Sequence, residues 1–145
     1  MQSPTISYLT KVQFGAGALS DLAEVMANVG ITRPLVVTDQ PLVELGFVAK
    51  LGLADPIVFA DIQSNPTESS VLKGLESYRE HGCNGFIALG GGSPIDAAKA
   101  MAILATHDIQ LEDAAYIRGG LDRITSEMPP LIAIPTTAGT GTEVG

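Results

Sequence analysis

The chain has 145 residues, 46% of them hydrophobic, and carries eight basic against sixteen acidic side chains, a formal net charge of −8. This length fits one domain with a sizeable core, and the composition excludes a disordered chain. The acidic balance, without any cluster of lysine or arginine, argues against nucleic acid and anionic membranes as partners. Small-molecule chemistry is the function class that remains.

Cysteine usage and the start of the chain bear on its compartment. The single cysteine, Cys83, excludes an internal disulfide and a metal site built from several thiolates. No charged leader precedes an apolar run at the start, and no stretch reaches the length of a membrane span. We therefore expect a soluble, cytoplasmic protein whose Cys83 is an inert buried thiol.

The first part of the chain predicts two strand–helix units. A short strand is expected at 12–14, followed by a helix that Gly30 ends. The β-branched run 35–39 predicts a buried strand, and Pro41 then starts a second helix. The apolar positions of that second helix are Leu42, Leu45, Val48 and Leu51.

Three further strands follow. The segment 56–60 predicts one strand, before a helix that Thr67 and Ser70 cap and that ends at His81-Gly82. Segment 86–89 predicts the next, before a glycine loop and a helix with a buried stripe. The last strand is expected at 131–134. Residues 106–130 carry the weakest pattern, with a short helix expected at 111–115 and a loop through Gly119-Gly120.

Apolar strands that alternate with amphipathic helices predict an α/β fold: a doubly wound, mostly parallel, Rossmann-like sheet with helices on both faces. In such a sheet the ligand crevice lies at the carboxyl ends of the strands. Asp39, the glycine loop 90–93 and the loop 136–142 each follow a predicted strand. They are therefore expected to meet at one edge of the sheet.

The glycine loop is the most informative stretch. Gly90-Gly91-Gly92-Ser93 joins a buried strand to a helix, with Pro94 at the expected first helical position and Ser93 as its expected cap. Glycines let backbone N–H groups approach a ligand closely, and a helix start attracts anions. A phosphate cradle and a plain strand-to-helix turn explain the loop equally well.

Two other loops offer polar groups. Asp39 follows Gly15-Ala16-Gly17 at about the interval at which a dinucleotide fold places an acid on the adenosine ribose. A carboxylate there would favour NAD over NADP, although an aspartate that merely forms a turn is the commoner case. Thr136, Thr137 and Thr140 lie in a hydroxyl-rich loop that suits phosphate or ribose oxygens, although threonines also cap backbone groups.

The remaining polar residues have adequate structural explanations. Asp96 is expected in the first turn of the helix after the glycine loop, where a negative side chain meets the helix dipole favourably. A cofactor contact by Asp96 is the alternative. His81 and His107 belong to no metal-spacing motif.

Taken together, these stretches resemble the iron-containing (group III) alcohol dehydrogenases. The similar segments are Phe14 to Gly17, Val37 to Asp39, Asn65 to Thr67, Gly90 to Lys99 and Ile134 to Val144, in that order. The resemblance covers essentially the whole chain and implies that residues 1–145 are the dinucleotide-binding domain of a two-domain enzyme. Such an enzyme transfers hydride between NAD(P) and an alcohol or aldehyde.

The resemblance also implies roles for single residues. Asp39 would hold the adenosine ribose, with Asn65 near it or the cofactor, and Gly91, Gly92 and Ser93 would bind the pyrophosphate. Thr136, Thr137 and Thr140 would flank adenine and phosphates, and Asp96 is a further cofactor-binding candidate. The family's helical second domain carries an aspartate and three histidines that bind divalent iron, and this chain lacks it. No catalytic or metal-binding residue is therefore assigned here, and the chain alone is expected to be inactive.

Two other interpretations stay open. One is the cofactor domain of a zinc-dependent glycerol dehydrogenase or of an enzyme similar to dehydroquinate synthase, since both share a glycine loop of this shape. The other is a non-catalytic α/β binding module, for example one with Asp39 as a phosphoacceptor. The expected partners are an alcohol or aldehyde substrate and a second copy of the chain, with no nucleic acid or membrane.

Overall fold

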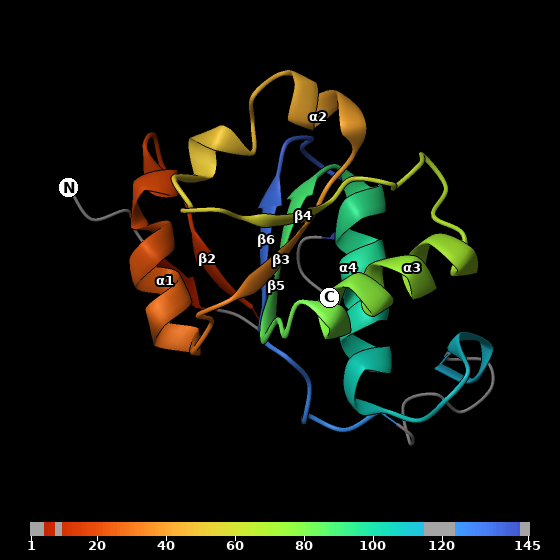
Figure 1. Ribbon diagram of the computed structural model, residues 1–145. Coiled ribbons are helices and arrows are strands. Elements are labelled where there is room, and N and C mark those ends of the chain that lie inside the picture. The colour runs from red at the N-terminus through yellow and green to blue at the C-terminus, as the bar shows by residue number, and fades with distance from the viewer. Residues whose placement is uncertain (1–4, 8–9, 115–123, 143–145) are drawn as a thin grey trace.

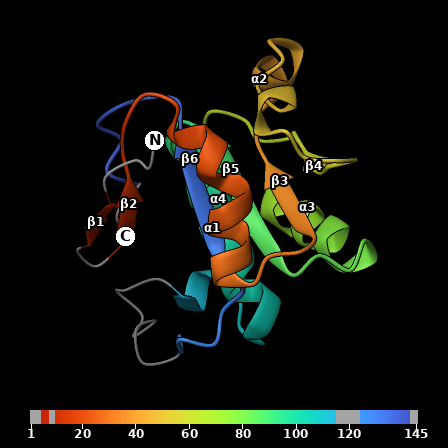
Figure 2. The same cartoon turned by 90° about the vertical axis from the view of Figure 1, so that its left-hand side faces the viewer.

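The computed structural model describes residues 5–7, 10–114 and 124–142. Its centre is a parallel four-stranded sheet in the order β4-β3-β5-β6 (Figure 1). The strands are β3 (Pro34–Val37), β4 (Ile57–Phe59), β5 (Gly85–Gly90) and β6 (Leu131–Pro135). A separate antiparallel pair, β1 (Thr5–Ser7) and β2 (Lys11–Gln13), lies beside this sheet (Figure 2).

Helices cover both faces of the parallel sheet. On one face, α3 (Glu68–Glu80) and α4 (Gly92–Thr106) pack on Leu35, Val37 and Phe86. On the other face, α1 (Leu22–Val29) packs on alternate strand residues, among them Val36 and Ile87. Figures 1 and 2 show α1 on the opposite side of the sheet from α3 and α4. The predicted doubly wound α/β fold is confirmed.

The strands form where apolar, β-branched runs can be buried from both sides. All six residues of β5 are buried, whereas β4 and β6, at the edges, are half-buried along most of their length. A continuous apolar run without polar alternation is typical of such a doubly covered parallel sheet. This pattern explains why the sequence predicts the central strands so closely.

Local signals also set the ends of the helices. Gly30 ends α1 with a φ of 79°, a left-handed conformation that glycine adopts without strain. Thr67 and Ser70 form a reciprocal capping box at the start of α3, and this helix ends at Glu80 with His81 as its C-cap. These three predictions are confirmed.

The second expected helix is shorter than the sequence predicts. It begins at Gln40, ends at Glu44 as α2, and is followed by turns and a 3-10 helix at Ala49–Leu51. Gly46 has a φ of 77°, which a continuous α-helix does not allow, so the helical spacing of apolar residues up to Leu51 was misleading.

Smaller differences occur near the N-terminus and after α4. β2 lies one residue before the expected strand, and the sequence analysis did not predict β1. Two more 3-10 helices are present, at Ala18–Asp21 and at Leu111–Ala114. The latter corresponds to the short helix expected at 111–115, and the loop expected at Gly119-Gly120 lies outside the described residues.

The strand order creates a switch point. β4 pairs with β3 on one side and β5 pairs with β3 on the other, so the connections that leave β3 and β5 diverge at their carboxyl ends. In open parallel sheets this divergence opens a crevice for ligands. None of the helices in the described part of the chain is long and apolar enough to cross a membrane.

Candidate functional site

A groove of about 550 Å³ lies at the switch point. Asp39 after β3, Gly91 and Gly92 after β5, and Thr136 and Thr137 after β6 all line it. Ser93, next to Gly92, lines it as well, so the structure brings together six of the predicted site residues. They follow three different strands and meet because the carboxyl ends of parallel strands share one edge of the sheet.

Asp39 caps α2. Its Oδ1 atom accepts a hydrogen bond of 3.0 Å from the backbone N–H of Leu42, and its backbone is extended, as an N-cap residue requires. The structural alternative of the sequence analysis is therefore correct in this respect. Because the cap holds the half-buried carboxylate at the groove, the same residue remains available to a ligand.

A side chain would meet different obstacles at the three glycines of the loop, Gly90, Gly91 and Gly92. Gly90 has a φ of 148°, and a Cβ atom there would lie 2.7 Å from Cγ of Pro94, so the fold itself requires glycine. A Cβ at Gly91 would lie 3.3 Å from Oγ1 of Thr137. A Cβ at Gly92 would lie no closer than 3.6 Å to its neighbours, which is ordinary contact.

The fold does not require glycine at 92. A Cβ there would nevertheless occupy the space between the glycine loop and the loop 136–142, here called the threonine loop. No side chain caps α4, whose N-cap is Gly91. The first N–H groups of a 15-residue helix therefore lie at the groove without a capping side chain. Backbone amides with no adjacent side chains are the arrangement that binds phosphate.

Ser93 has a different role from the one predicted. It is the second residue of α4, not its cap, and Pro94 is the third residue, not the first. The Ser93 hydroxyl donates a hydrogen bond of 2.8 Å to the carbonyl oxygen of Ser64. This bond fastens the loop between β4 and α3 to the glycine loop, so Ser93 shapes the groove wall with its side chain. The sequence could not reveal an acceptor 29 residues away.

The threonine loop is fixed at both ends. The backbone N–H of Thr136 donates to the carbonyl oxygen of Gly90 over 2.8 Å, which extends the β5–β6 pairing into the site. The Lys99 side chain on α4 donates to the carbonyl oxygen of Thr142. Thr140 lies beside Gly92 and shares a hydroxyl–hydroxyl hydrogen bond of 2.9 Å with Thr142. Thr140 is not among the residues that line the groove.

Asn65 and Asp96 are exposed and do not line the groove. Asp96 is the fifth residue of α4, past the first turn in which the sequence analysis placed it. Asn65 follows two groove residues that the sequence analysis missed, Gln63 and Ser64. Neither missed residue belongs to a recognisable motif, because the path of the loop brings them to the groove.

The side chains of His81 and His107 form hydrogen bonds with backbone atoms. Nδ1 of His81 donates to the carbonyl oxygen of Ser77, and Nδ1 of His107 to that of Ile103, over 2.8 and 2.9 Å. Nε2 of His107 accepts from the backbone N–H of Thr125. Among the described residues, no three histidine, cysteine, aspartate or glutamate side chains are grouped so that they could hold a metal ion.

Cys83 is buried next to Tyr78, whose ring stacks on Phe86. Burial raises the pKa of the Cys83 thiol, and the nearby Arg33 guanidinium offsets this only in part. Burial also raises the pKa of the Tyr78 phenol. The buried position is as predicted, and a thiol with a raised pKa stays protonated at neutral pH.

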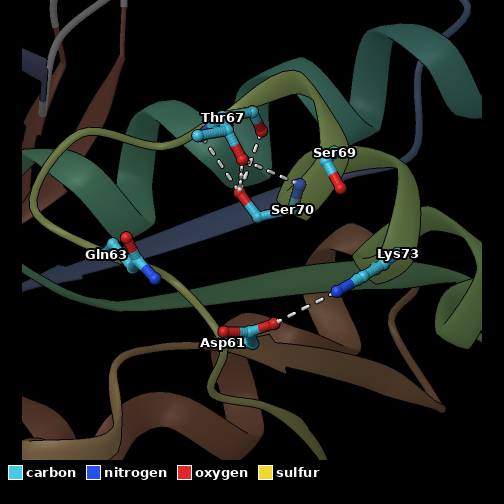
Figure 3. A pocket seen from close by; sticks show the side chains of 6 residues that line it. All are labelled: Asp61, Gln63, Thr67, Ser69, Ser70 and Lys73. Atoms are coloured by element: carbon cyan, nitrogen blue, oxygen red, sulfur yellow. Dashed lines mark hydrogen bonds and ion pairs between the residues drawn. The ribbon is translucent and has the colours of Figure 1, made fainter.

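A smaller pocket, shown from close by in Figure 3, shares a lining residue with the groove. Gln63 lines both spaces. In the pocket, Lys73 on α3 reaches towards Asp61 with an Nζ–Oδ2 distance of 3.9 Å. The sequence analysis singled out neither residue.

Comparison with known proteins identifies the family of this chain. The sequence model of the family "Iron-containing alcohol dehydrogenase" matches residues 10–145. The chain belongs to this family. The resemblance found in the sequence is thereby confirmed.

Individual relatives are much longer than this chain. It is 49% identical to 4-hydroxybutyrate dehydrogenase of Cupriavidus necator, over 96% of this chain and 37% of that protein. It is 38% identical to lactaldehyde reductase of Escherichia coli strain K12, over 90% of this chain and 35% of that protein. The chain thus spans little more than a third of the length of these two relatives.

Solved structures agree with the fold. A 1,3-propanediol oxidoreductase superposes with a TM-score of 0.78 at 34% identity, covering 90% of this chain and 35% of that one. A sulfoacetaldehyde reductase of Bifidobacterium kashiwanohense, solved in complex with NAD+, superposes with a TM-score of 0.77 at 31% identity and the same coverage.

Proposed function

We propose that residues 1–145 form the NAD-binding domain of a metal-dependent alcohol dehydrogenase that transfers hydride between an alcohol or aldehyde and NAD. The groove at the switch point is the observation that carries the proposal. It combines a carboxylate, an uncapped helix N-terminus and a hydroxyl-rich loop at one edge of a doubly wound sheet. The family membership and the NAD+ complex of a structural relative support the same conclusion.

The residues of the groove fit a dinucleotide. The backbone amides of Gly92 and Ser93 would bind the pyrophosphate, since a Cβ at Gly92 would fill the space beside the threonine loop. Asp39 would accept hydrogen bonds from the adenosine ribose, and Thr136 and Thr137 would flank the nucleotide. Asn65 and Thr140 belong to the supporting loops. When bound, NAD supplies the group that accepts or donates hydride.

In this proposal the metal is not bound by the described residues. The described residues offer no group of ligands for it, so divalent iron and the catalytic residues would lie in a further part of a longer protein. We further propose a cytoplasmic location and a homo-oligomer.

Calorimetric titration of NAD+ into the wild-type chain and into the Gly92→Ala variant tests the proposal. The fold tolerates a Cβ at this position, so Gly92→Ala should keep its thermal stability. The methyl group should nevertheless lower the affinity for NAD+ by about tenfold or more, because it hinders the approach of a phosphate to the amides.

Two results would count against the proposed site. One is a wild-type chain that binds no NAD+ at millimolar concentration. The other is a stable Gly92→Ala variant with unchanged affinity. Thermal denaturation of the same sample serves as the folding control for either result.

A further inference from the structure

The pocket next to the groove contains a second carboxylate close to Asp39. It has a volume of about 130 Å³ and is lined by Asp61, Gln63, Thr67, Ser69, Ser70 and Lys73. Gln63 lines both spaces, so the pocket and the groove are neighbours. Asp61 also directly precedes Ile62, which lines the groove.

The backbone brings the two aspartates together. Asp39 follows β3, Asp61 follows β4, and the two residues form an isolated β-bridge. Directly opposed residues in such a pair have Cβ atoms roughly 5 Å apart on the same face. The bridge therefore places a second acidic residue opposite the aspartate that we assign to the adenosine ribose.

Lys73 offsets this second charge only in part. Its Nζ atom lies 3.9 Å from Oδ2 of Asp61, and Figure 3 shows the two side chains pointing toward one another. The side chains are 63% and 60% exposed, so water and salt weaken the pair. The part of the Asp61 charge that Lys73 does not neutralise adds to the negative electrostatic potential of Asp39.

We propose that Asp61 and Lys73 act with Asp39 to determine which adenosine ribose the groove accepts. Asp61 disfavours a ribose that carries a 2′-phosphate, and Lys73 moderates this discrimination. Both act through charge, without contact to the reacting atoms. The inference rests on the proposed function, since it requires that a dinucleotide occupies the groove.

The charges of the two cofactors make the discrimination measurable. The 2′-phosphate of NADP adds close to two negative charges that NAD lacks, so a neighbouring carboxylate affects NADP far more than NAD. For an assumed separation on the order of 8 Å, Coulomb's law in water gives about a three- to tenfold change in relative affinity when one charge is removed. A change in packing would instead alter the binding of both cofactors.

The test compares NAD+ and NADP+ in titrations of the 145-residue chain followed by amide chemical shifts. Asp61→Asn should improve NADP+ binding relative to NAD+ by about three- to tenfold, and Lys73→Gln should worsen it by about two- to fivefold. Both differences should shrink in ~1 M NaCl, where the screening length is about 3 Å.

Asp55→Asn is the matched control. It removes the same charge, but Asp55 precedes β4 whereas Asp61 follows it, so the two residues lie at opposite ends of the strand. Asp55 has a φ of 50°, a conformation that asparagine also adopts, so this variant should fold normally. Its ratio of the two affinities should equal that of the wild type.

The outcomes separate this inference from the proposed function. If the wild type binds NAD+ and the ratio stays unchanged in Asp61→Asn and Lys73→Gln, or moves equally in Asp55→Asn, the role of Asp61 and Lys73 is refuted while the cofactor site stands. If the wild type binds neither dinucleotide, both proposals fail. Opposite shifts in the two variants, diminished by salt, support the inference.

Discussion

Asp39 caps α2 with one carboxylate oxygen and is also one of the residues that line the groove. These tasks depend on different properties. Capping needs an acceptor oxygen of the right reach, which asparagine also offers, whereas discrimination against a 2′-phosphate needs the negative charge. Substitutions can therefore separate the structural role from the proposed cofactor role.

For Asp39 we expect two variants to behave differently. Asp39→Asn should keep the free energy of unfolding within about 0.5 kcal/mol, because the cap persists, while Asp39→Ala should lose about 1 kcal/mol. Both should raise the affinity for NADP+ relative to NAD+ on the order of tenfold, because the repelling charge is gone. Denaturant unfolding and paired titrations measure the two effects. A variant that lacks the charge but keeps the full NAD+ preference would refute the ribose assignment.

At the scale of elements, the turn from β5 into α4 holds the site in place. Gly90 adopts the positive φ that the turn requires, and Gly91 and Gly92 leave backbone uncovered by side chains. Ser93 holds the neighbouring loop by its hydrogen bond to Ser64. The Thr136–Gly90 hydrogen bond links β6 to the same turn. The turn therefore mixes residues required by the fold with residues free for a ligand.

We therefore predict that alanine substitutions at Gly90 and Gly92 have different effects on the free energy of unfolding. Gly90→Ala should destabilise the fold by about 1–3 kcal/mol, because its φ of 148° is strained for alanine and the Cβ would contact Pro94. Gly92→Ala should leave the free energy of unfolding within about 1 kcal/mol of the wild type. Chemical denaturation of both variants checks this, and equal stability of the two would contradict our account of the turn.

The elements also show how far sequence reasoning reaches. Buried strands and helix caps follow from local chemistry, so the β-branched run of β3, the Thr67 cap and Gly30 were predicted correctly. The end of α2 was not, because the apolar spacing up to Leu51 continues through Gly46. Local patterns cannot show that a chain turns away at a glycine with positive φ.

The same limit applies to the groove. Asp39, Gly91, Gly92, Thr136 and Thr137 were predicted because each follows a strand in a recognisable motif. Gln63, the Ser93–Ser64 bond and the pairing of Asp61 with Asp39 depend on contacts between separate segments. They became visible only in three dimensions.

At the scale of the whole molecule, the described residues form a groove at one edge of the parallel sheet but no cluster of metal ligands. Hydride transfer in a metal-dependent dehydrogenase needs a substrate oxygen polarised by a metal that several convergent ligands hold. In our proposal the cofactor site and the metal site thus belong to different parts of the enzyme.

We therefore expect the 145-residue chain alone to bind no stoichiometric iron or zinc and to show no dehydrogenase activity. Elemental analysis after dialysis and an NADH absorbance assay with a panel of short alcohols measure these two properties. Metal retained at one equivalent, or turnover above the buffer rate, would reveal a site that the described residues do not show.

The central claim is that the groove at the β3/β5 switch point binds NAD. A titration of isotope-labelled chain with NAD+, followed through backbone amide shifts, tests it most directly. We predict saturable shifts concentrated at Gly91, Gly92, Ser93, Thr136 and Thr137. The account would be contradicted if these amides stayed unmoved at millimolar NAD+, or if the shifts concentrated on a surface away from the carboxyl ends of the strands.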